Sequence, residues 1–72
     1  MTQTWPQLTG AEFLDVLRRN GWSILVVGEQ YWAAQQRGAV QVRLRNITPE
    51  TTMPPYLVEE WAEKFGLTLA NF

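Results

Sequence analysis

Residues 22–46 constrain the fold more than any other part of the chain, because they have the pattern of a three-stranded antiparallel sheet. The run WSILVV is rich in β-branched residues, and Gly28-Glu29 after it favours a tight turn. QYWAAQ is the second predicted strand, and QRG marks the next turn. AVQVRLR then alternates, with Val40, Val42 and Leu44 on one face and Gln41, Arg43 and Arg45 on the other. This alternation predicts a half-buried antiparallel strand.

A well-delimited helix is predicted before these strands, in LTGAEFLDVLRRNGW. Thr9 and Glu12 have the spacing of a capping box, and Asn20-Gly21 is a typical helix stop. The apolar residues between them recur at helical spacing, so one face of the helix should be buried. They are Phe13, Leu14, Val16 and Leu17.

A second helix is predicted in YLVEEWAEKF, after a loop NITPETTMPP. Pro54-Pro55 suits a first helical turn, where no amide donor is required, and Gly66 should end the helix. Its apolar stripe contains Leu57, Val58, Trp61, Ala62 and Phe65. The tail TLANF is expected to pack against the domain through Leu69 and Phe72.

The expected fold is therefore α+β, with the order α-β-β-β-α in one domain that spans residues 1–72. Three short strands form one antiparallel sheet, and two amphipathic helices cover one of its faces. This is the layout of double-stranded-RNA-binding domains.

Composition narrows the chemistry. The 72 residues include no Cys and no His, which excludes disulfides, thiolate metal sites and an imidazole general base. No metal or cofactor is expected. The net charge of −1 gives no overall attraction to nucleic acid. The N-terminal residues lack the pattern of a signal peptide and the longest apolar run, ILVV, is too short to span a bilayer, so we expect a cytoplasmic protein without membrane contact.

From Leu8 to Phe72 the chain resembles the HicA family of small toxins, also called YcfA-like. LTGAEFLDVLRRNGW is similar to the opening helix of that family, and GEQYW lies where the family has Gly-Ser-His before polar and aromatic residues. GAVQVRLRN resembles its third strand, and MPPYLVEEWAEKFGLTLANF its final helix. The resemblance rests on the order and spacing of these segments together.

The resemblance implies an mRNA interferase that a partner antitoxin neutralises, with an essential histidine in the second strand. Gly28 matches the glycine of the family, whereas Glu29 stands in place of the serine and Gln30 in place of the histidine. Glutamine cannot take up or deliver a proton near neutral pH. The resemblance therefore favours the fold over the activity, and no catalytic residue is assigned.

The candidate binding residues combine aromatic, arginine and amide side chains, which are frequent at protein interfaces. They are Gln30, Tyr31, Trp32, Arg37, Gln41, Arg43 and Arg45. Tyr31 and Trp32 should lie on opposite faces of their strand, one in the core and one outside. The competing interpretation is structural: the arginines form a solvated strand face, and all four Trp pack to compensate for a thin core.

Three functions remain open. The leading hypothesis is a non-catalytic protein-binding module on a HicA-like scaffold, either a toxin-antitoxin relic or a phage or mobile-element inhibitor of a host nucleoprotein complex. Its partner would be an antitoxin-like protein or a host complex. The alternatives are a HicA-type mRNA interferase toxin and a non-cleaving RNA-binding protein. A free edge strand could also pair with another copy of the chain.

Overall fold

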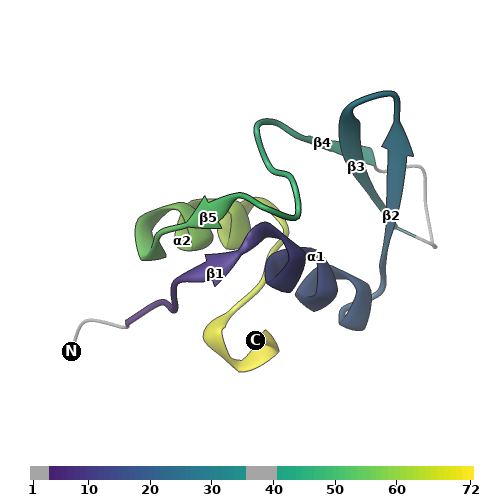
Figure 1. Cartoon of the computed structure of the whole chain (residues 1–72). Helices are drawn as coiled ribbons and strands as arrows, with labels where there is room; N and C mark the ends of the chain where they lie inside the picture. The colour runs from purple at the N-terminus through teal and green to yellow at the C-terminus, as the bar shows by residue number, and fades with distance from the viewer. Residues whose placement is uncertain (1–3, 36–40) are drawn as a thin grey trace.

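The computed structural model describes residues 4–35 and 41–72, and every structural statement below refers to that part of the chain. Its main elements are two helices and one three-stranded sheet, and a second, smaller sheet consists of two very short strands (Figure 1). In chain order they are β1 (Leu8–Thr9), α1 (Gly10–Arg19), β2 (Trp22–Val27), β3 (Gln30–Gln35), β4 (Gln41–Leu44), β5 (Thr52–Met53), α2 (Pro55–Lys64) and a 3-10 turn, Leu69–Asn71.

The larger sheet is the predicted antiparallel meander, in the order β2-β3-β4. The register between β2 and β3 is continuous from Trp22 opposite Gln35 to Val27 opposite Gln30. Gly28 has a φ of 62°, which a two-residue hairpin with glycine at its first central position requires. The prediction of a tight turn at Gly28-Glu29 is confirmed.

The capping box of α1 is confirmed atom by atom. The Glu12 amide donates to Thr9 Oγ1 at 3.2 Å, and the Thr9 amide donates to Glu12 Oε1 at 2.9 Å. These bonds satisfy two of the amide groups that a helix N-terminus leaves without a partner. The helix ends at Arg19, and the Asn20 amide closes its last turn on the carbonyl oxygens of Val16 and Leu17.

The predicted loop over residues 46–55 is wrong in one respect, because it contains strand β5. Leu8 lies opposite Met53 and Thr9 opposite Thr52, so β5 pairs with β1 just before α1 begins. The observed order therefore adds one short strand before the first helix and one before the second. Nothing in the local sequence indicates this pairing, since two-residue strands have no period to detect.

Helix α2 runs from Pro55 to Lys64, one residue earlier at each end than the predicted YLVEEWAEKF, and it ends in a Schellman motif. The Leu67 amide donates to the Ala62 carbonyl oxygen at 2.8 Å, and the Gly66 amide to that of Glu63 at 3.2 Å. The end of the helix is thus determined by backbone hydrogen bonds around Gly66, as the sequence predicts.

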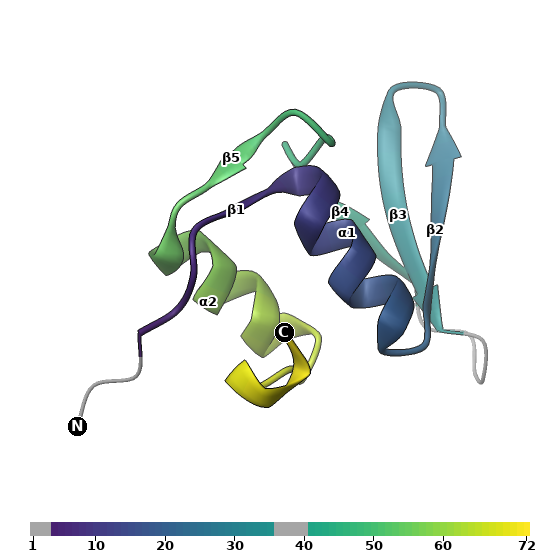
Figure 2. The ribbon, with the colours of Figure 1, turned by 60° about the horizontal axis from the view of Figure 1, so that its bottom comes forward.

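One hydrophobic core joins both helices to a single face of the larger sheet. Phe65, which follows the last residue of α2, is central to it: its ring lies 4.7 Å from that of Trp22 on β2 and 6.3 Å from that of Phe13 on α1. Helix α1 lies between the sheet and α2 (Figures 1 and 2). Both helices therefore lie on the same side, and within residues 4–35 and 41–72 no helix covers the opposite face of the sheet.

The C-terminal tail packs through Phe72, whose ring contacts those of Trp5 and Phe13 at 5.6 and 6.2 Å. Leu69 is half-buried but does not join the core. Asn20 Nδ2 donates to the Asn71 carbonyl oxygen at 3.1 Å, which ties the tail to the end of α1. Within the described residues, no helix has the length and apolar character needed to cross a membrane.

Candidate interaction surface

The uncovered face of the larger sheet carries most of the predicted binding residues. Because side chains alternate along a strand, Trp22, Tyr31 and Leu44 face the helices and their neighbours face outward. We define the open face by the outward residues Leu25, Val27, Gln30, Trp32, Gln41 and Arg43. It therefore combines an apolar part on β2, an aromatic on β3 and polar side chains on β4.

A row of three side chains crosses the middle of the open face. Leu25 lies opposite Trp32, and Trp32 lies opposite Arg43. Directly opposed side chains have Cβ atoms about 5 Å apart, so the three form one continuous strip. Leu25 is 43% exposed, Trp32 is half-buried and Arg43 is exposed. The strip therefore offers an aromatic ring with an apolar neighbour on one side and a cation on the other.

The structure assigns the two neighbouring aromatics to opposite sides, as expected. Tyr31 packs against the core on the helix side, so it does not belong to the open face. Trp32 is the outward aromatic. Arg37 lies outside the described residues.

The other three tryptophans differ in how deeply they are buried. Trp22 and Trp61 are each 7% exposed and belong to the core, whereas Trp5 is half-buried against Phe72. Two of the four tryptophans, Trp22 and Trp61, are therefore core residues, and the other two, Trp5 and Trp32, are half-buried. The purely structural interpretation, in which all four pack into the core, does not hold for Trp32.

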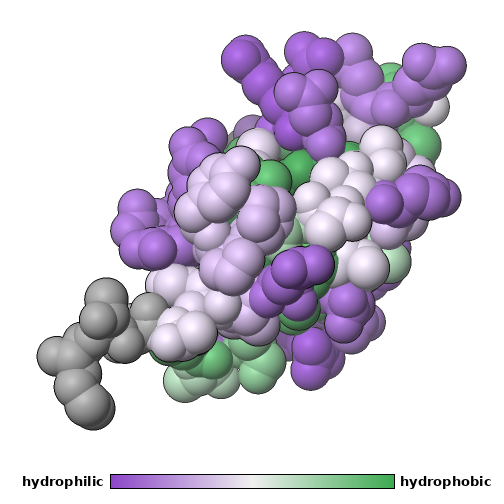
Figure 3. Space-filling view, turned by 60° about the vertical axis from the view of Figure 1, so that its left-hand side comes forward, coloured by the Kyte–Doolittle hydropathy of each residue, from purple (hydrophilic) through white to green (hydrophobic). Residues whose placement is uncertain are grey.

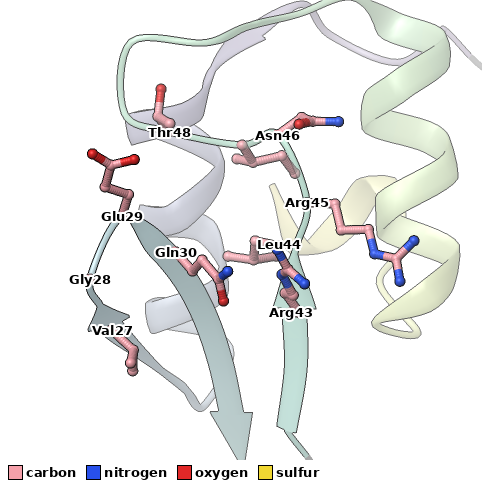
Figure 4. Close-up of a pocket in the computed structure, with 10 residues that line it drawn as sticks. Val27, Gly28, Glu29, Gln30, Arg43, Leu44, Arg45, Asn46 and Thr48 are labelled. Atoms are coloured by element: carbon pink, nitrogen blue, oxygen red, sulfur yellow. The ribbon is translucent and has the colours of Figure 1, made fainter.

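A groove of about 640 Å³ adjoins the open face at the turn between β2 and β3 (Figure 4). One wall is the hairpin tip, residues 27–30, and the other is the loop from Asn46 to Thr48. The end of β4, with Arg43 and Arg45, lies between them. In Figure 4 the Gln30 side chain is directed toward Arg43, whereas Arg45 extends away from both. The groove thus brings three predicted residues together, but its two arginines do not converge.

The loop wall of the groove is held rigidly. Asn46 adopts a φ of 59°, a left-handed conformation that asparagine tolerates well. The Thr48 amide donates to Thr51 Oγ1 at 3.0 Å, and the Thr51 amide donates back to the Thr48 carbonyl oxygen at 3.0 Å. The Gly10 amide then donates to the Thr51 carbonyl oxygen at 2.6 Å. This loop is therefore fastened to the first turn of α1 and forms a preorganised wall.

Some charged side chains of the described residues have a partner within the molecule, and others do not. Within residues 4–35 and 41–72 the structure has a single ion pair, Arg19 with Asp15 at 3.2 Å. Lys64 lies over the Trp61 ring, 4.5 Å from its centroid. Arg43 and Arg45 therefore have no carboxylate within 4 Å in the described part of the chain, and their guanidinium groups remain available to a partner.

Sequence reasoning missed three contributors to this surface. Leu25 and Val27 belong to an apolar run that was predicted to be a strand without any assignment of exposed residues, and they are 43% and 62% exposed. Asn46 was a loop residue without an assigned role, yet it lines the groove. The run WSILVV has no polar alternation, so no local signal distinguishes its exposed residues from its buried ones.

The opposite side of the molecule differs in character. Figure 3 shows mostly hydrophilic and near-neutral residues around α2 and β5, with only small, separate hydrophobic areas. Tyr56, which is 72% exposed, is the large apolar side chain that α2 presents to solvent. The other exposed large hydrophobic residues of the described chain all lie on β2, and they are Leu25, Val26 and Val27.

The chemistry of the open face is that of its polar and aromatic side chains. Among the described residues, no three acidic or other ligand side chains gather as a metal ligand set would require. The open face carries an indole, a guanidinium and two amides, which donate and accept hydrogen bonds or stack. Comparison of the chain with protein-family models, curated proteins and solved structures finds no match.

Proposed function

We propose that this chain is a non-catalytic protein-binding module on a HicA-like scaffold, and that it recognises its partner through the open face. The observation that carries the proposal is the strip Leu25–Trp32–Arg43 on a sheet face that no helix covers. Trp and Arg are the residue types most enriched among those that dominate interface energetics. A half-buried Trp at the centre of an exposed apolar and cationic strip has the composition of such a hot spot.

The shape of the surface also supports protein recognition. The strip lies on a three-stranded sheet, whose backbone is held by continuous ladders, so little ordering is needed on binding. The groove beside it has one wall fixed to α1 through Thr51 and Gly10. A partner residue could enter this groove while the strip is covered. A preorganised surface of this kind loses less conformational entropy than a flexible one.

The partner should present an apolar side chain together with a carboxylate. The apolar group would cover Leu25 and Trp32, and the carboxylate would accept from Arg43, which can form a bidentate pair. Such a partner could be an antitoxin-like protein or a component of a host nucleoprotein complex. The chain itself would be a toxin-antitoxin relic in the first case and a phage or mobile-element inhibitor of the host complex in the second, and both would use the open face in this way.

RNA binding, with or without cleavage by a HicA-type mRNA interferase, is the second candidate. The observation that favours it is the groove, which places Gln30 beside Arg43 and near Arg45. Each phosphate contact steepens the slope of log affinity against log salt concentration by about one. Two arginines would make at most a few such contacts, so they provide weak binding. Arg19 is already paired with Asp15, and Arg45 extends away from Arg43. These features make RNA the weaker candidate.

The test is affinity capture with the tagged chain from its native host lysate, with and without nuclease, read by mass spectrometry. The proposal expects a stoichiometric protein that survives nuclease and is lost with Trp32→Ala. Truncation of a central hot-spot residue costs about 2 kcal/mol or more, which is roughly a 30-fold loss of affinity. Tyr56→Ala is the matched control, because it removes an exposed aromatic from α2 and should retain the partner.

A different result would refute the proposal. Recovery of RNA alone, with an affinity that falls steeply as salt rises, would support the RNA-binding alternative. In that case Arg43→Ala and Arg45→Ala should both weaken binding. Growth arrest on expression that Gln30→Ala abolishes would instead indicate an active toxin.

A further inference from the structure

The two free edges of the larger sheet differ in charge. Strand β2 contains no charged residue and no proline, and it pairs one-to-one with β3 along all six residues without a bulge. Strand β4 carries Arg43 and is followed directly by Arg45. Charged residues, prolines and bulges are the usual means by which proteins prevent an edge strand from pairing with another chain. By this criterion the β4 edge is protected and the β2 edge is not.

The second half of β2 is also uncovered on both faces. Three consecutive residues, Leu25, Val26 and Val27, are 43%, 59% and 62% exposed. Because consecutive side chains point to opposite faces, Val26 is exposed on the helix side while Leu25 and Val27 are exposed on the open face. Helix α1 packs against the first half of the strand, where Trp22 is buried. The apolar surface therefore extends around the free edge.

The backbone of this edge has groups without partners in the sheet. The two-residue turn makes Val27 and Gln30 a hydrogen-bonded pair. Hydrogen-bonded pairs alternate along an antiparallel ladder, so the backbone of Leu25 also bonds to β3, whereas the backbone groups of Ile24 and Val26 point toward the free edge. The N–H and C=O groups of Ile24 and Val26 thus face away from β3. An extended strand beside β2 would satisfy them.

We propose that the occupant of this edge is the β2 strand of a second copy of the chain, paired antiparallel. A two-fold axis at Leu25 would place that residue opposite its counterpart and Ile24 opposite Val26 of the other copy. In this register Ile24 of one copy and Val26 of the other form hydrogen-bonded pairs, because their backbone groups are the ones that point to the free edge. The strand is uncharged, so self-pairing juxtaposes no like charges, whereas self-pairing of β4 would bring arginines together.

The pairing joins two three-stranded sheets into one of six strands. Its two-fold axis is perpendicular to the sheet, so both open faces lie on the same side. The dimer would therefore present two Trp32 strips on one continuous surface. This inference does not depend on what the open face binds.

The association should be weak and concentration-dependent. A standard stable interface buries about 800 Å² per partner, which is roughly a sixth of the 4958 Å² that this chain exposes. One strand pair with its apolar side chains buries less than that. We therefore expect a dissociation constant on the order of micromolar or weaker.

Analytical ultracentrifugation of the full chain, from about 1 μM to about 1 mM, tests the pairing. The mass should rise from 8.3 kDa toward twice that value. Val26→Lys places charge at the free edge without disturbing a buried residue, and it should weaken association at least tenfold. Tyr56→Lys is the matched control: it makes the same charge change at an exposed apolar residue of α2 and should leave association unchanged.

Amide hydrogen exchange, measured by NMR at low and high concentration, identifies the surface used. Protection of the Ile24 and Val26 amides should increase with concentration, whereas the Leu25 and Val27 amides, already bonded to β3, should change little. A chain that stays monomeric throughout this range would overturn the proposal. A dimer that is insensitive to Val26→Lys would overturn it as well, as would a monomer whose β2 edge is protected only by a foreign protein.

Trp32→Ala separates this inference from the proposed function. It should leave the dimer intact, because the indole belongs to β3 and not to the free edge. Loss of the partner protein with an unchanged dimer would show that the open face and the edge act independently.

Discussion

Replacement of Gly10 by alanine should destabilise this protein, although helix propensity alone predicts the opposite. Gly10 is the buried first residue of α1, and its amide donates to the Thr51 carbonyl oxygen at 2.6 Å. A Cβ at this position would overlap the Thr48 carbonyl oxygen and lie 2.8 Å from the Thr48 carbonyl carbon. Both are backbone atoms, so no side-chain rotation relieves the contact and the loop itself must move.

The magnitude follows from what that movement disrupts. Overpacking in a tight contact costs about 1–3 kcal/mol. Displacing the loop also weakens two backbone hydrogen bonds, from Gly10 to Thr51 and from Ala11 to Pro49, each worth about 1 kcal/mol. Alanine recovers at most about 1 kcal/mol of helix propensity. The free energy of unfolding should therefore fall by roughly 3 kcal/mol, which in a domain of this size lowers Tm by about 12–24 °C.

Thermal and urea unfolding, followed by circular dichroism and Trp fluorescence, measures this loss. Gly28→Ala is the control, because a Cβ there meets no atom within 4 Å and only the φ of 62° opposes it. That change should cost about 1–2 kcal/mol. A Gly10→Ala variant whose Tm equals or exceeds that of the parent chain, or falls no further than that of Gly28→Ala, would show that the loop accommodates the Cβ.

Three further substitutions test other parts of the fold. Thr9→Ala removes the capping oxygen of α1 and should lower the free energy of unfolding by about 1 kcal/mol in urea titrations. Phe65→Ala removes the ring that links α2 to Trp22, so a loss of about 3–5 kcal/mol is expected; near-normal near-ultraviolet circular dichroism would contradict it. Asn20→Ala breaks the bonds to Asn71 and should accelerate amide exchange in residues 69–72 while α1 remains protected; unchanged exchange would show that Phe72 alone holds the tail.

The elements whose signals are local could be predicted from the sequence. The start of α1 depends on a bond between residues three apart, and the end of α2 on bonds around Gly66, so both can be read from spacing alone. The turn at Gly28 is equally local. Alternation also predicted that Tyr31 and Trp32 face opposite ways. Each of these depends on neighbours in the chain, because capping and turn geometry are short-range.

Which apolar residues remain exposed depends on the packing of the helices against the sheet and could not be predicted from the sequence. WSILVV is uniform in sequence, yet Trp22 is buried and Val26, on the same face of the strand, is 59% exposed, because α1 packs against only the first half of β2. The pairing of β1 with β5 and the wall formed by Asn46 likewise depend on segments far apart in the chain. Burial of a strand residue depends on where the helix that packs against the sheet ends, and the sequence of the strand contains no signal of that position. The edge proposed for self-pairing arises from this partial coverage, and the open face arises because both helices lie on the other side of the sheet.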